Sequence, residues 1–440
     1  MARYAHIIGW GKAIPRRVMT NDDWAKLVDT SDEWIRSRTG VRERHFVSDG
    51  ESTLTLALEA ARNALEVARL SPAYLDLIIV ATVTPEYHFP ATACLVQDRL
   101  GANRAAAFDL SAGCSGFIYG LSLASDAIRA GSYQYALVIG AETLSRIMDW
   151  QDRTTCVLFG DGAGAVVLAA SQVPGGVISC TLGADGSGGD YLIMPGGGSR
   201  HPTTRETVEQ RMHYIKMNGR EVFKFATRTM DRATRLVCER ANVPLQDVEL
   251  VVPHQANDRI IQAAAKSLGL SDDIFYVNLD RYGNTSAASI PIALCEVLEK
   301  GLVRRHDHVV LVGFGAGLTW GASLIQWETP FPATTLKWWQ RLYNAIYYRW
   351  AQLRSWLARL RRRVEGWQTP ENGNGSPPRK TLSAPHREEK GAPSDHPEAR
   401  EGRAKHAEEV SPTTGGHTAS SEETVARPRD ADHPEHRTGP

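Results

Sequence analysis

The chain has 440 residues, 42% of them hydrophobic, and its 50 basic and 50 acidic residues give a formal net charge of zero. This length allows one large core or two ordinary domains, and the balanced charge argues against the overall basicity of a nucleic-acid-binding protein. No run reaches the roughly 18 apolar residues of a membrane span, and the N-terminus lacks the pattern of a secretory signal. We therefore expect a cytoplasmic protein.

Six cysteines are spread singly along the chain, without a CxxC pair: Cys94, Cys114, Cys156, Cys180, Cys238 and Cys295. A chain of this size does not need disulfide bonds to fold, so we expect free thiols in a reducing compartment. No cysteine or histidine cluster has the spacing of metal ligands, and we expect no metal ion.

Composition divides the chain into three regions. Residues 1 to about 330 alternate apolar runs with glycine-containing turns, as globular domains do. Residues 331–367 are rich in Trp and Arg. Residues 368–440 hold ten of the 22 prolines and no aromatic residue. This last region cannot bury enough apolar surface to offset chain entropy, and we expect it to be disordered.

An internal duplication runs through the first region. The stretch "VARLSPAYLDLIIVATVTP" (67–85) aligns with "RANVPLQDVELVVPHQAN" (240–257), each with a helix end, a turn with Pro and an apolar strand. Further along, "FDLSAGCSGFIYGLSLASDAIRAG" (108–131) aligns with "VNLDRYGNTSAASIPIALCEVLEKG" (277–301). Each of these pairs indicates the same local structure in two places.

A third aligned pair, "YALVIGAET" (135–143) and "HVVLVGFGAG" (308–317), completes a repeated order of strand, helix and strand. This order predicts parallel sheets covered by helices in two similar halves, residues 1–175 and 176–330. Ligands of such sheets bind beyond the carboxyl ends of the strands.

Three polar residues follow the predicted strands: Cys114, His254 and Asn284. In the first turn of a helix, Cys114 would feel the positive end of the helix dipole, which lowers the pKa of a thiol toward the nucleophilic thiolate. His254 and Asn284 can both donate hydrogen bonds to an oxygen that becomes negative during a reaction. The combination is typical of thioester chemistry.

Each of these residues also has a simpler structural interpretation. A cysteine in apolar surroundings is usually a small buried hydrophobe, His254 could be a structural histidine, and Asn284 beside Gly283 could be a turn residue. The segment "FGDGAGAVVL" (159–168) suggests a nucleotide-binding loop. It precedes a predicted strand and does not open a helix, so we interpret its glycines as turn residues.

Six ordered motifs within residues 1–328 resemble β-ketoacyl-acyl-carrier-protein synthase III, the initiating condensing enzyme of bacterial fatty acid synthesis in the thiolase-like superfamily. They are "TSDEWIRSRTGVRERH" (30–45), "AGCSGF" (112–117), "FGDGAGA" (159–165), "PHQAN" (253–257), "YGNTSAASIP" (282–291) and "GFGAGLTWG" (313–321).

The resemblance implies an α/β fold of the duplicated, five-layered αβαβα type. It implies an acyltransferase that condenses an acyl-CoA primer with malonyl-acyl-carrier protein, giving 3-oxoacyl-carrier protein, CO2 and CoA. It also implies a homodimer, with no cofactor beyond the two thioester substrates. A rival interpretation is a related acyl transferase or condensing enzyme of secondary metabolism.

Residue by residue, the resemblance implies that Cys114 is the acylated nucleophile and that His254 and Asn284 form the decarboxylation pair. The implied contacts to coenzyme A are Trp34 and Arg153, which would sandwich the adenine, with Arg38 beside them and Arg259 at the channel mouth.

Further residues match family positions at interfaces. Phe89, in "YHFPATAC", matches a residue that reaches across the dimer into the acyl pocket of the partner. Lys224, Arg259 and Lys266 match basic positions of the face that docks the carrier protein. Ser267 follows Lys266 where the family has a further basic residue, so the docking patch departs from the family pattern.

The family resemblance does not extend to residues 336–367. There, apolar residues recur at heptad-like spacing (339, 346, 353, 360 and 336, 343, 350, 357, 364), and eight basic residues stand against one acid, Glu365. This pattern predicts an amphipathic helix. It could lie on an anionic membrane surface, which would make the chain a membrane-associated interaction protein. Alternatively, it could pack on the catalytic body or on a dimer mate.

Overall fold

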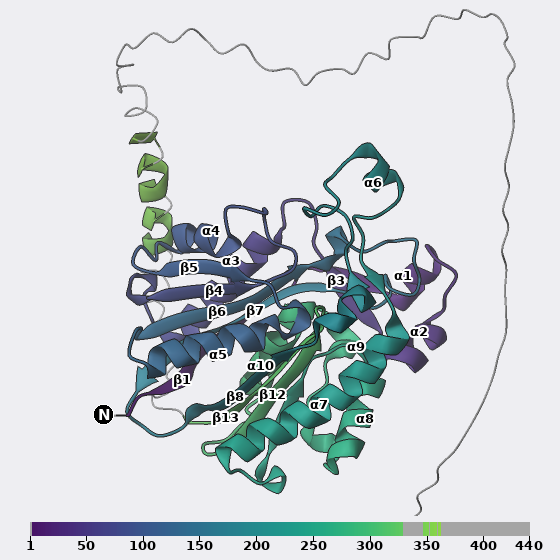
Figure 1. Ribbon diagram of the computed structural model, residues 1–440. Coiled ribbons are helices and arrows are strands. Elements are labelled where there is room, and N and C mark those ends of the chain that lie inside the picture. The colour runs from purple at the N-terminus through teal and green to yellow at the C-terminus, as the bar shows by residue number, and fades with distance from the viewer. Residues whose placement is uncertain (1, 329–345, 352, 359, 362–440) are drawn as a thin grey trace, which may run out of the picture. The chain divides into compact units, whose positions relative to one another are not determined.

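The computed structural model describes residues 2–328, 346–351, 353–358 and 360–361, and these belong to one compact unit. Two β-sheets form its framework, with helices between them and on their outer faces (Figure 1). All six cysteines are free thiols, which confirms the prediction. In the part of the chain that the structure describes, no helix is long and apolar enough to cross a membrane.

The first sheet has the strand order β1-β7-β6-β4-β5. Its strands are β1 (Tyr4–Ala13), β4 (Leu77–Ala81), β5 (Ala106–Leu110), β6 (Tyr135–Thr143) and β7 (Asp161–Ser171). β4 pairs in parallel with β5 and β6, but β7 is antiparallel to both β6 and β1. The predicted parallel pairing is therefore confirmed for β4, β5 and β6, whereas β7 adds an antiparallel neighbour, because β6 and β7 are joined without the crossover helix that parallel neighbours need.

The second sheet has the order β11-β12-β13-β8, built from β8 (Gly176–Ala184), β11 (Leu250–Pro253), β12 (His308–Gly315) and β13 (Thr319–Gln326). β11 and β12 are parallel, whereas β12–β13 and β13–β8 are antiparallel. A tight turn joins β12 to β13, and such a turn allows only antiparallel pairing. Strands of the first sheet lie within residues 4–171 and those of the second within 176–326.

Six helices make three layers around the two sheets. An outer layer of α3 (Thr53–Ala68) and α4 (Thr92–Leu100) shares an apolar core with the first sheet. A central layer of α5 (Gly116–Arg129) and α10 (Ser289–Glu299) packs between the sheets. A second outer layer of α7 (Gly219–Ala241) and α8 (Asp258–Leu268) covers the other sheet. This arrangement confirms the predicted αβαβα layering (Figure 1).

Shorter elements connect these layers. They are β2 (Arg17–Thr20), α1 (Asn21–Ala25), α2 (Asp32–Thr39), β3 (Glu43–Phe46), β9 (Leu192–Ile193), α6 (Arg205–Glu209), β10 (Lys216–Met217) and α9 (Leu279–Tyr282). Two 3-10 turns, η2 (Gly113–Ser115) and η7 (Ser286–Ala288), lead directly into the central helices α5 and α10. They are equivalent turns of the duplication, and they bring the two halves together at the ends of the strands.

Three sequence predictions concern the glycine motif and the C-terminal region. Gly162 and Gly164 of "FGDGAGA" lie inside β7, where α10 approaches closely, so the interpretation of these glycines as turn residues was wrong. The predicted helix over 336–367 is present in its described part, since residues 346–351, 353–358 and 360–361 are helical. The predicted disorder of 368–440 lies outside the described residues.

Candidate active site

Cys114 lies in η2, at the entry to α5. The preceding Gly113 has φ +55°, and a Cβ there would lie 2.6 Å from the backbone nitrogen of Ala316. Glycine thus lets the cysteine turn pack directly against the 316–318 turn between β12 and β13. Cys114 itself is only 7% exposed.

The electrostatic surroundings of Cys114 differ from the expectation. Burial raises the pKa of Cys114 to about 12, and a hydrogen bond with the Ser286 side chain only partly offsets this. The prediction of a lowered pKa was wrong, because desolvation of a buried thiolate outweighs the favourable helix terminus. The thiol is therefore protonated in the unliganded protein.

His254 follows β11 and is held there by a hydrogen bond from its backbone N–H to Val312 O, 2.8 Å. Its ring stands edge-on to Phe314, with 5.3 Å between the ring centroids. The side chain is buried, yet neither ring nitrogen has a hydrogen-bond partner. Burial also lowers the pKa of His254 to about 3, so the imidazole is neutral and can donate one N–H bond.

Asn284 is oriented by its neighbours. Its side-chain oxygen accepts a hydrogen bond from Ser286 N–H, 2.8 Å, so the amide NH2 is left to donate elsewhere. The residue before it, Gly283, has φ +62°, and a Cβ there would lie 2.8 Å from Leu158 O. Only glycine fits this approach, which lets the Asn284 backbone pair with the segment around Phe159.

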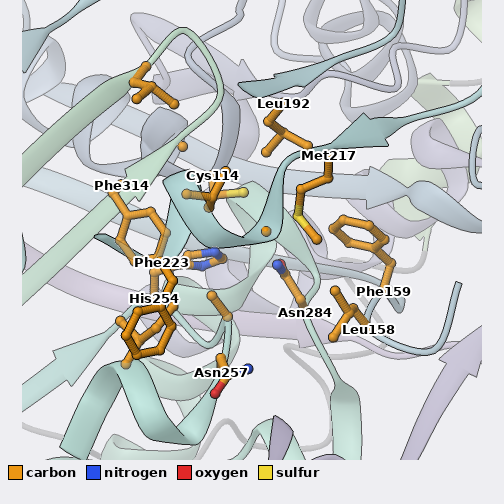
Figure 2. Close-up of a pocket in the computed structure, with 16 residues that line it drawn as sticks. Cys114, Leu158, Phe159, Leu192, Met217, Phe223, His254, Asn257, Asn284 and Phe314 are labelled. Carbon is orange, nitrogen blue, oxygen red and sulfur yellow. The ribbon is translucent and has the colours of Figure 1, made fainter. Parts of the chain in front are cut away.

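Cys114, His254 and Asn284 line one cavity of about 130 Å³, with apolar walls that include Phe223 and Phe314. Figure 2 shows the sulfur, the imidazole ring and the amide nitrogen facing the same space. A second cavity of about 160 Å³ also reaches Cys114 and is lined by side chains such as Leu144 and Ile147. The thiol thus stands between two apolar spaces. Within the described residues, no cluster of three or more His, Cys, Asp or Glu could hold a metal ion.

The residues predicted to contact coenzyme A gather near α2. The guanidinium groups of Arg38 and Arg153 lie 4.6 Å and 5.6 Å from the Trp34 ring centroid. Arg259 donates to Ser37 O, 2.8 Å. Asn257, which lines the catalytic cavity, donates to Arg38 O, 3.0 Å, so this cluster lies at the rim of that cavity.

Phe89 is not brought to the thiol in the single chain. Its side chain is 86% exposed and lines a separate surface hollow. Lys224 on α7 and Lys266 on α8 are exposed and also lie away from Cys114, and Lys224 pairs with Glu221 at 2.7 Å.

Sequence reasoning missed two features of the site. Glu142, at the end of β6, is fully buried and accepts a hydrogen bond from Ser286, 3.0 Å, and from Thr84, 2.5 Å. Burial raises the pKa of Glu142 to about 7, although these hydrogen bonds oppose the rise. No sequence signal distinguished it from other strand residues.

The second missed feature is an exposed basic row on α7, spaced by four residues: Arg220, Lys224, Arg228 and Arg232. Residues four apart lie on one face of a helix, so this spacing could have been found in the sequence. The same helix contributes Val222 and Phe223 to the wall of the catalytic cavity. The basic row and part of the cavity wall therefore belong to one helix, on different sides of it.

Comparisons with known proteins agree with this fold. Residues 108–186 match the family model "3-Oxoacyl-[acyl-carrier-protein (ACP)] synthase III", and residues 238–327 match the model of its C-terminal part. The chain is 56% identical to the β-ketoacyl-[acyl-carrier-protein] synthase III of Caldanaerobacter subterraneus subsp. tengcongensis, over 74% of this chain and 98% of the relative. It is 57% identical to the same enzyme of Symbiobacterium thermophilum, over 73% and 97%.

A solved structure gives the same result. The crystal structure of 3-oxoacyl-[acyl-carrier-protein] synthase III from Aquifex aeolicus is 48% identical, with a TM-score of 0.69, and matches 73% of this chain and all of that one. Fold and site together define a condensing acyltransferase of the thiolase-like class. The chain belongs to the β-ketoacyl-[acyl-carrier-protein] synthase III family, whose reaction initiates fatty acid synthesis.

Proposed function

We propose that Cys114, His254 and Asn284 condense an acyl-CoA primer with malonyl-acyl-carrier protein, with loss of CO2. The observation that supports this most strongly is the unpartnered His254 ring beside the oriented Asn284 amide, both in the cavity that Cys114 lines. A buried polar group without a partner is costly, and a substrate oxygen would supply that partner.

In the first half-reaction, the Cys114 sulfur bonds to the acyl carbonyl carbon while the bond from that carbon to the CoA sulfur breaks. The thiol proton leaves on the CoA sulfur, so free CoA and an acyl-cysteine result. The backbone N–H of Cys114 and one from the adjoining segment 313–317, at the end of β12, stabilise the intermediate oxyanion. The close packing of Gly113 against Ala316 supports this assignment.

In the second half-reaction, malonyl-carrier protein loses CO2, and the electrons of the broken carbon–carbon bond form an enolate. The N–H of neutral His254 and the amide of Asn284 donate to the enolate oxygen. The enolate carbon then attacks the acyl-cysteine, and the departing Cys114 thiolate takes up a proton. The product is 3-oxoacyl-carrier protein, and these steps call for no further cofactor.

The two substrates approach from neighbouring surfaces. The adenine of coenzyme A binds at Trp34, Arg38 and Arg153, with Arg259 at the cavity rim, as their clustering around one indole ring supports. The acidic carrier protein docks on the α7 row together with Lys266. A row of exposed cations on one helix attracts an acidic partner and speeds its encounter.

A homodimer is part of the proposal. β5 is the edge strand of the first sheet, and its Phe108 is 40% exposed. An unpaired edge with an exposed aromatic residue favours pairing with a second copy. Such a dimer would cover Phe89, as the family pattern implies. We place the enzyme in the cytoplasm, where its thioester substrates are made.

The high identity to relatives named as synthase III favours this function over a condensing enzyme or acyl transferase of secondary metabolism. The test is to incubate the protein with a panel of acyl-CoAs and malonyl-carrier protein, and to weigh the carrier-bound products. We expect 3-oxoacyl products whose formation releases CO2. Simple transfer of the acyl group without loss of CO2 would instead support the alternative.

A further inference from the structure

The described residues between 346 and 361 form a helix, called the 346–361 helix below. One face of this helix is docked on the catalytic body. Tyr347 donates to Gly101 O, 3.1 Å, and Ser355 donates to the Asp98 carboxylate, 2.5 Å, both at the end of α4. Ala351 is 1% exposed. Tyr348 packs against the core beneath α3 and α4 and receives the Arg62 guanidinium 4.9 Å from its ring centroid. These contacts hold the helix through one side only.

The other side of the helix is apolar and uncovered in the single chain. Six large apolar side chains project from it, 43% to 58% exposed: Ile346, Trp350, Leu353, Trp356, Leu357 and Leu360. Successive residues of a helix are about 100° apart, which places all six on the side opposite Ala351. We call these six residues the outer stripe. It contains the described members of the heptad-like pattern.

An exposed stripe of this kind indicates an interaction surface. The body does not cover it, because the body contacts are made by the opposite side of the helix. The helix therefore packs on the catalytic body, as one of the sequence alternatives had it, but through the side opposite the apolar stripe. A membrane surface and a second copy of the chain remain as occupants.

Charge favours the membrane. Arg349 lies on the same side of the helix as the outer stripe, and Arg354 stacks its guanidinium 5.0 Å from the Trp350 ring centroid. Over residues 336–367 the sequence has eight basic residues and one acid. Trp rings and basic side chains around an apolar face are typical of helices that lie in the headgroup region of anionic bilayers.

The same charges disfavour a second copy. In a symmetric dimer the same patch forms both sides of the interface, so each side would bring the arginines of this helix and, among its described residues, no acidic side chain. Like charges that meet at an interface without acidic partners are repulsive. Phosphate headgroups of anionic lipids, in contrast, supply the missing negative charge.

We propose that the outer stripe binds the surface of anionic membranes and anchors the condensing enzyme there as a peripheral protein. The body-facing contacts fix the helix so that the catalytic body stays attached while the stripe enters the headgroup region. This proposal is independent of the condensation chemistry.

The test measures partition of the full chain onto sedimented vesicles. We expect binding to vesicles of phosphatidylcholine with phosphatidylserine, and little binding to phosphatidylcholine alone. The double variant Leu353→Glu with Leu357→Glu should lower the partition coefficient about 100-fold, because it places charge in the apolar stripe. Arg349→Glu with Arg354→Glu should lower it on anionic vesicles by a similar factor. Added salt should weaken the binding of the unaltered chain.

Leu302→Glu is the matched control, since Leu302 is 50% exposed but lies in a turn far along the chain from the helix. It should bind vesicles as the unaltered chain does, and all variants should keep condensing activity, which separates this test from that of the catalytic proposal. Absence of binding to anionic vesicles would overturn the proposal. So would a stripe variant that binds vesicles normally but changes the sedimentation coefficient of the free protein, because that result indicates pairing with a second copy.

Discussion

The resting state of the Cys114 thiol offers a quantitative test of the site. Burial raises its pKa from an ordinary value of 9.0 to about 12, and three pKa units correspond to about 4 kcal/mol. A helix N-terminus favours a nearby negative charge by at most about 2 kcal/mol. Burial therefore dominates, and at pH 7 the thiol is almost entirely protonated. We predict that Cys114 reacts slowly with iodoacetamide near neutral pH.

The alkylation rate at Cys114 should rise about tenfold for each pH unit between pH 6 and pH 9, without a plateau, because only the thiolate reacts. Intact-protein mass spectrometry follows the reaction, and Cys114→Ala measures the background from the other cysteines, including exposed Cys94. A plateau reached below pH 8 would refute the reasoning. Such a plateau would mean that the thiolate already exists in the resting enzyme, as expected if the helix dipole outweighed burial.

Three further predictions follow from the geometry of the site. His254→Ala and Asn284→Asp should still form the acyl-enzyme, but their rate of condensation should fall about 100-fold to 1,000-fold, the usual effect of removing an oxyanion donor. Single-turnover assays of each half-reaction measure the two rates separately. Gly283→Ala should lower the Tm by several degrees in calorimetry, because its backbone conformation and the nearby Leu158 O exclude a side chain, at a cost of about 1–3 kcal/mol. Arg228→Glu should raise the KM for malonyl-carrier protein in steady-state kinetics and leave acylation by acyl-CoA unchanged.

Matched variants separate these effects from general damage. Asn284→Asp keeps an acceptor for Ser286 N–H, whereas Asn284→Ala leaves that buried group unpaired. If the two variants condense equally poorly, the lost donor is responsible; normal condensation by Asn284→Asp would contradict the proposed role. Arg69→Glu, at the end of α3, is the control for Arg228→Glu. An equal rise in KM for both would exclude a local docking role for α7.

Much of the site could be predicted from sequence because Cys114 and His254 come soon after the strands β5 and β11. Asn284 instead follows the short helix α9 and lies just before η7, so the strand predicted ahead of it is absent. The pKa values of the site residues could not be predicted, because they depend on how deeply each side chain is buried in the fold. The pKa of Cys114 follows from the depth of the cavity, which strand and helix patterns do not contain.

The burial of Glu142 also could not be predicted from the sequence. In the sequence it ends an apolar strand, where a glutamate usually marks the approach to solvent. In the fold, that strand end is covered by η7, and hydroxyl groups such as those of Thr84 and Ser286 stabilise the carboxyl group. These partners lie 58 and 144 residues away along the chain. No local pattern connects them.

The sequence predicted that residues 346–361 form an amphipathic helix. It did not predict which side of this helix contacts the catalytic body. The heptad-like pattern captured the large apolar residues, which form the outer stripe. The docked side uses Tyr347, Ala351 and Ser355, whose small or polar side chains do not stand out as a core-facing pattern. Hydrogen bonds to α4, which sequence periodicity cannot reveal, decide the orientation.

The central claim is that Cys114 carries the acyl group between the two substrates. The most direct test is the intact mass of the protein after incubation with an acyl-CoA, followed by addition of malonyl-carrier protein. We predict one acyl adduct on the unaltered chain, none on Cys114→Ala, and clearance of the adduct as the 3-oxoacyl product appears. An adduct that forms on Cys114→Ala, or one that malonyl-carrier protein does not clear, would contradict the account.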